Sequence, residues 1–189
     1  MSGRTPPIVG LTALEPEYAP DHDLGMPNAI KMLQDDNNSM HILLGQIQMI
    51  PAGQADAENK AAAQVASMFT THSRLEDEFI TPLLTELHPE LATESDDEHD
   101  QAKRLLAKIE DLPAGLARRH VVAEFSEVVK AHKVTQEASV FPLLIEMLDV
   151  GELEDLGRRM QAAEQPLRQA GVDTTSAAET AGHRVYPQL

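Results

Sequence analysis

One pattern occurs twice in this chain: a histidine is followed ten residues later by Pro-Leu-Leu. The first copy begins at His72 and the second at His132, sixty residues further on, and each has acidic residues one turn or slightly more after the histidine. Residues i and i+4 share one face of an α-helix, so His72 and Glu76 can reach a common point. Two such helices packed face to face would direct their imidazoles and carboxylates to one buried position, as in the metal sites of helix bundles.

The remaining pattern is helical throughout. Apolar residues recur at helical spacing over about 28–50, 56–84, 95–110 and 116–148, and no segment alternates as a strand does. A capping box from Ser95 to Glu98 is predicted to begin the third helix, and Pro82 to kink or end the second. Long helices joined by short loops become antiparallel neighbours. The sequence therefore predicts an all-α, up-down-up-down four-helix bundle.

Outside these four helices, a shorter fifth helix is predicted from Glu152 to about Leu167. Residues 1–27 carry five prolines without periodicity, and residues 169–189 are small, polar and aperiodic. We expect an irregular arm at 1–27, a bundle domain at 28–168 and a loose tail at 169–189.

Composition excludes several classes of function. The chain has 15 basic and 31 acidic residues, a formal charge of −16, which disfavours binding to nucleic acid or to an anionic membrane. No apolar run approaches the roughly 18 residues of a membrane span. The absence of cysteine removes disulfides, thiolate metal sites and thiol nucleophiles. With no secretion signal in the sequence, we expect a cytoplasmic protein.

Polar residues interrupt the predicted apolar stripe of every long helix. A single histidine on such a stripe is more often a hydrogen-bonded core residue than a metal ligand. Here three histidines lie on three different helices, two of them with an inward carboxylate, and this combination favours a metal site. The interrupting residues are Asn37 and His41, His72 and Glu76, His99, and His132.

On these residues, the chain from Asn28 to about Val150 resembles the hemerythrin-like domains, also called HHE cation-binding domains. The similar features are the His-x-x-x-Glu of the second helix, the histidine of the third, and the His-plus-carboxylate before Phe-Pro-Leu-Leu of the fourth. The resemblance implies a non-heme iron site, usually of two irons bridged by carboxylates. It implies that His72 binds one iron, that Glu76 bridges, and that His99 and His132 bind the other.

The chain departs from the family pattern on three helices. Gln136 stands where many HHE domains carry a bridging glutamate, and Glu137 stands one residue later, at the spacing of true hemerythrins, so Glu137 is favoured as the second bridge. Asn37 stands where the first helix of the family has a histidine, for which His41, one turn later, is a candidate replacement. Lys103 replaces a second histidine on the third helix.

These departures leave three outcomes open: a rearranged di-iron site, a single metal, or a site that has lost its metal. A mixed set of imidazole and carboxylate donors suits iron or manganese, and zinc also accepts it. The resemblance implies an iron protein that binds or reacts with O2, peroxide or nitric oxide. The alternatives are a non-catalytic module that binds iron and reports it to a protein partner, and a scaffold with a degenerate site.

Overall fold

The computed structural model describes the backbone of residues 28–181 and the side chains of residues 28–167. Within these residues the chain is helical and has no strand, which confirms the predicted all-α fold. The predicted arm at 1–27 and the last residues of the predicted tail, 182–189, lie outside this part. The elements are α1 (Ala29–Met49), α2 (Ala55–Phe79), α3 (Thr81–Leu87), α4 (Pro89–Asp111), α5 (Leu116–Thr135), the π-helical segment η1 (Gln136–Val140), α6 (Phe141–Met147) and α7 (Val150–Ala181).

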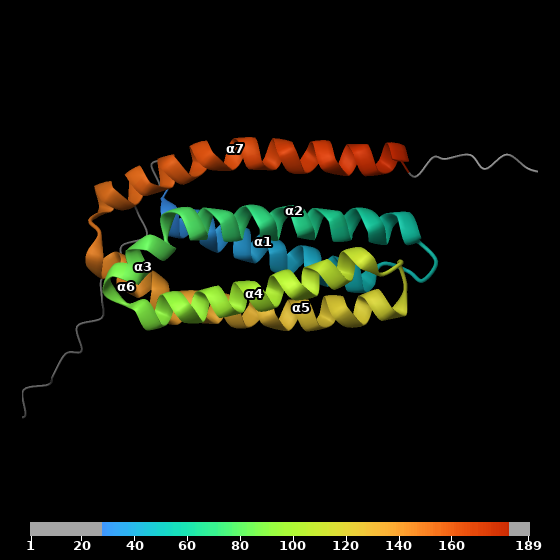
Figure 1. The fold of residues 1–189 in the computed structure, drawn as a ribbon, viewed down its shortest axis with the longest axis horizontal. Helices are drawn as coiled ribbons and strands as arrows, with labels where there is room; N and C mark the ends of the chain where they lie inside the picture. Colours follow the sequence, from blue (N-terminus) through green and yellow to red (C-terminus); the bar gives the residue numbers. More distant parts are fainter. Residues whose placement is uncertain (1–27, 182–189) are drawn as a thin grey trace, which may run out of the picture.

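Four of these helices form the predicted bundle. α1 packs against α2 and α5, and α4 packs against α5 and α2, so the four close into a ring with antiparallel neighbours (Figure 1). The fifth long helix, α7, lies along α2 and α1 on the outside of this ring (Figure 1). No helix in the described part of the chain is long and apolar enough to span a membrane.

The two Pro-Leu-Leu motifs begin corresponding short helices. Pro82 lies in the first turn of α3 and Pro142 in the first turn of α6, the helical position that tolerates proline best. α2 ends at Phe79, directly before the first of these helices, as predicted for a helix that Pro82 ends. The second short helix continues α5 through η1 without a loop.

Two helix boundaries differ from the prediction. The prediction that a capping box at Ser95 begins the third helix is wrong. This helix, α4, begins six residues earlier, at Pro89, and Ser95 is buried inside it. Proline is well suited to the first helical position, so Pro89 already begins the helix that Ser95 was expected to cap. The backbone of α7 continues to Ala181, beyond the predicted end near Leu167, and includes Pro166.

The core of the bundle consists of two apolar clusters with a polar layer between them. On α2, Phe69 belongs to one cluster and Phe79 to the other. The same change of cluster occurs on α1 between Leu33 and Met40, on α4, and between α5 and the η1 segment that continues it. In each of these four helices the buried residues between the two clusters are polar. They are Asn37; Thr71, His72, Ser73 and Glu76; Ser95 and His99; and His132 with Gln136, which begins η1.

Candidate metal centre

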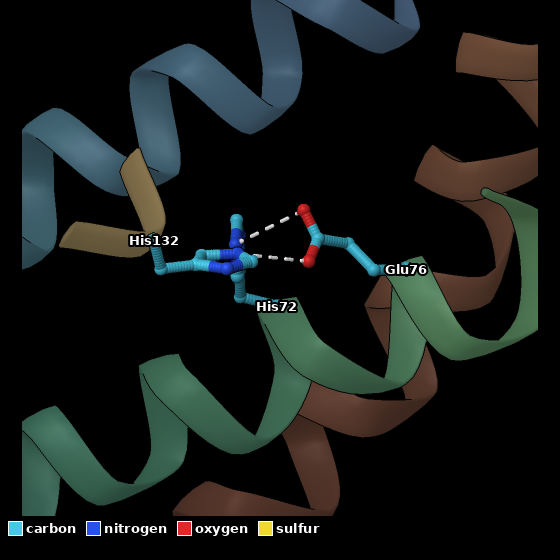
Figure 2. Close-up of side chains that lie close together, drawn as sticks. All are labelled: His72, Glu76 and His132. Carbon is cyan, nitrogen blue, oxygen red and sulfur yellow. Dashed lines mark hydrogen bonds and ion pairs between the residues drawn. The ribbon is translucent and has the colours of Figure 1, made fainter. Parts of the chain in front are cut away.

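Three imidazoles from three helices meet at the carboxylate of Glu76. The Nε2 atom of His72, one turn earlier on α2, lies 3.3 Å from Glu76 Oε1. The Nε2 atoms of His99 on α4 and His132 on α5 lie 2.8 and 3.1 Å from Glu76 Oε2, and 3.4 Å from each other. Figure 2 shows His72 and His132 turned toward Glu76. All four residues are at most 4% exposed.

The other ring nitrogen of each histidine faces a second carboxylate. The Nδ1 of His132 donates to Glu98 at 2.8 Å, and Glu98 also accepts from the Thr135 hydroxyl at 2.9 Å. Metal-bound histidines in proteins almost always have such a partner, which fixes the ring and directs the free nitrogen to the metal. The three pairs are His132 with Glu98, His99 with Asp77 at 3.4 Å, and His72 with Asp36 at 3.8 Å.

These outer carboxylates were not identified from the sequence. The signal that could have found them is their position next to an inward-facing residue. Asp36 precedes Asn37, Asp77 follows Glu76, and Glu98 precedes His99. Such neighbours lie at the edge of the buried face, where a carboxylate can reach the cluster and keep part of its hydration.

A chain of two amides contacts the other oxygen of Glu76. Gln136 Nε2 donates to Glu76 Oε1, and Asn37 Nδ2 donates to Gln136 Oε1 at 2.5 Å. An ionised carboxylate only accepts hydrogen bonds, so Gln136 must direct its NH2 group to Glu76. Its oxygen then accepts from Asn37, whose own oxygen is buried without a partner. Both predicted positions, Asn37 and Gln136, therefore lie at the cluster.

Two other predicted residues do not point into the cluster. Glu137 has a side chain that is 47% exposed and lies 3.6 Å from Lys133 Nζ. Its neighbour Gln136 faces inward, and successive helical residues point in directions about 100° apart. His41 is exposed on α1 beside buried Met40, for the same reason. The structure thus places neither Glu137 nor His41 where the resemblance implies a ligand.

Lys103, the third departure from the family pattern, also faces solvent. Its side chain is 47% exposed, and its Nζ lies 3.5 Å from Asp77 Oδ2. Asp77 in turn faces His99, so Lys103 contacts the outer carboxylate and not the Glu76 cluster.

The opposite charges of the cluster stabilise one another. Burial opposes the imidazolium form of His72, but the carboxylates of Glu76 and Asp36 outweigh it and raise the pKa of His72 to about 10. Burial acts likewise on His132, where Glu76 and Glu98 raise the pKa to about 9. Burial would raise the pKa of Glu76, yet His72 and His132 hold it well below its usual value. Without a metal, the cluster is therefore a buried network of ion pairs.

The cluster also fits a metal ion. Ligand atoms of His72, Glu76 and His132 lie within 4.8 Å of one another, and the Nε2 of His99 is within 3.4 Å of the last two. Atoms at about 2.1 Å from one ion lie about 3 Å apart when adjacent and about 4 Å apart when opposite. Neither ring nitrogen of His72 makes a well-formed hydrogen bond, although both are buried. A cation between these atoms would satisfy them.

Comparison with known proteins agrees with this fold. No protein-family model matches the chain, and no curated protein matches it. A solved structure is similar, that of a hemerythrin HHE cation-binding domain-containing protein from Mycobacterium kansasii. The TM-score is 0.68 at 23% sequence identity, over 77% of this chain and 90% of the other. The chain therefore has the hemerythrin-like helical-bundle fold, with a buried His/Glu/His cluster in its core.

Proposed function

We propose that the chain binds iron at His72, Glu76, His99 and His132, and that the bound iron binds or reacts with O2, peroxide or nitric oxide. The observation that carries this proposal is the convergence of three Nε2 atoms on one buried carboxylate. Imidazole nitrogen with carboxylate oxygen is a donor set that suits iron. When bound, ferrous iron would supply an open coordination position for a small ligand and electrons to reduce it.

The protein's own contribution is to hold these donors in place. Asp36, Asp77 and Glu98 face the Nδ1 atoms, and each Nε2 is directed inward. The helix backbones fix His72 and Glu76 one turn apart on the same face. The two apolar clusters on either side of the polar layer keep bulk water away from it. Four protein donors are fewer than the six positions of an octahedral ion, which leaves room for a small ligand.

Iron loading followed by ligand addition tests this proposal. Metal-free protein is loaded with ferrous iron under argon and then mixed with O2, peroxide, nitric oxide or azide while absorption spectra are recorded. We expect a new absorption band with at least one of them, and its loss in His132→Ala. His41→Ala is the matched control, because His41 is exposed on a bundle helix. An iron-loaded protein with an unchanged spectrum under all four additions would refute the reactive function.

A second candidate function is a non-catalytic iron-binding module, which is favoured because the metal donors come from three different helices. They come from α2, α4 and α5, so a bound ion would join three helices and stabilise the bundle. A non-catalytic iron-binding module would melt at a much higher temperature with iron than without it, and would show no turnover. Its binding to a partner would depend on iron. Protein that carries no metal after growth with iron would instead be a scaffold with a degenerate site.

A further inference from the structure

We infer that the centre holds one metal ion and not two, and that Asn37 and Gln136 fill the position of a second ion. This inference rests on the proposed function, because it concerns how much metal the same cluster binds. It follows from the number of donors, from the direction of the two amides, and from the positions of the two residues that could have completed a second site.

The cluster has too few anionic donors for two ions. In the described side chains, only two glutamates are fully buried, Glu58 and Glu76. Glu58 lies away from the cluster, in the first turn of α2, where it accepts from the Gly115 N–H and pairs with Arg119. Glu76 is therefore the single fully buried carboxylate that contacts the Nε2 atoms of the imidazoles, because Asp36, Asp77 and Glu98 face the Nδ1 atoms instead. In ferritin-like two-metal bundles each of the four helices supplies a glutamate. The hemerythrin-like pattern that the chain resembles needs fewer carboxylates but still two bridging ones, and the cluster has only Glu76.

The amide chain presents the wrong polarity for a second cation. Gln136 offers NH2 hydrogens to Glu76 Oε1, and these carry partial positive charge. The Gln136 oxygen, which is the atom a metal would accept, is already engaged by Asn37. Turning Gln136 over would direct its oxygen at an ionised carboxylate, which is repulsive. The two amides therefore hold one oxygen of Glu76 and leave Oε2, with His72, His99 and His132, for the ion.

The residues that could have supplied a second site point elsewhere. Glu137 pairs with Lys133 at the surface, and His41 is exposed on α1. Rotating Glu137 inward would displace Gln136 from the buried face of the helix and break its bond to Glu76. The second position is thus occupied by a hydrogen-bonded pair of neutral side chains.

The test is a titration of the metal-free full chain with Mn(II) under argon, followed by native mass spectrometry and electron paramagnetic resonance. We expect one ion per chain and the signal of an isolated Mn(II). Two ions with a magnetically coupled signal would overturn the single-ion inference while leaving the proposed iron site standing. No bound ion, with iron also absent after anaerobic loading, would overturn both.

Two variants test the role assigned to the amides. Asn37→His combined with Gln136→Glu replaces the amide pair by an imidazole and a carboxylate, and we expect the bound metal to rise from one to two ions per chain. Glu137→Gln is the matched control, one residue away and exposed, and should keep one ion. If the double variant keeps wild-type helical content by circular dichroism but still binds one ion, the amides are not what excludes the second ion.

Discussion

Binding of one divalent ion should release about two protons from the buried imidazoles. The pKa values of about 10 for His72 and about 9 for His132 mean that both rings are protonated in the metal-free protein at pH 8. Both must lose the proton on Nε2 to bind a metal. From these values, the two rings together carry about 1.9 protons at pH 8, against about 0.06 for two ordinary histidines. The apparent affinity for the metal should accordingly rise about 100-fold for each pH unit near pH 7 to 8.

Calorimetric titration with Mn(II) in two buffers of different ionisation enthalpy measures this proton release directly. His72→Gln should lower the count by about one proton, because it removes one of the two charged rings. His120→Gln, at an exposed position on α5, should leave the number of released protons unchanged. Metal-bound water can release a proton in both variants, so the difference between them isolates the proton of His72. If the wild-type protein and His72→Gln released the same number of protons on binding Mn(II), the ion pairs at Glu76 would not hold His72 protonated.

Three further predictions concern the surroundings of the cluster. Glu98→Gln removes the anionic partner of His132 Nδ1 and should weaken metal binding about 10- to 100-fold, while exposed Glu94→Gln should not; competition with a chelator measures both. The metal-free protein should be most stable between about pH 4.5 and 6.5. The raised pKa values of His72 and His132 stabilise the folded protein fully below about pH 6.5, the ordinary pKa of histidine. This stabilisation is lost as the pH rises through about 9 to 10. Below about pH 4.5, the stabilisation that comes from the lowered pKa values of Glu76 and Glu98 is lost as the pH falls. Melting temperatures measured across this pH range would not change if the ion pairs were absent. Phe125→Ala, at a fully buried ring that packs edge-on against another phenylalanine, should cost about 3–5 kcal/mol in urea unfolding, against less than about 0.5 kcal/mol for exposed Leu116→Ala.

Much of the fold could be predicted because helical spacing is a local property of the sequence. The apolar stripe on each long segment fixes which face is buried, and the polar residues on that stripe must then lie in the core. This reasoning brings His72, Glu76, His99 and His132 together without knowledge of the loops. The outer carboxylates lie at the edges of the stripes, where the pattern does not distinguish a solvent-facing acid from one that turns toward a histidine.

The choice between Gln136 and Glu137 could not be made from spacing alone. An α-helix brings residues i and i+4 onto one face, whereas a π-helix has i to i+5 hydrogen bonds and brings i+5 closer to it. The π-helical segment begins at Gln136, so the turn after His132 is still α-helical and Gln136 faces inward. Had the π-helical segment begun a few residues earlier, Glu137 would have taken this place. No residue type in the sequence marks where such a segment starts.

The metal-free and metal-bound forms of the cluster should carry the same total charge. In the absence of metal, two imidazolium rings face the carboxylate of Glu76 and the outer acids. Replacing two protons by one divalent ion leaves the total charge of this buried layer unchanged, so the surrounding acids need not move or change protonation. A second divalent ion would add two positive charges at a position lined by neutral Asn37 and Gln136, where burial makes an unbalanced charge costly. The ion-pair network is thus matched in charge to a single divalent ion before any metal arrives.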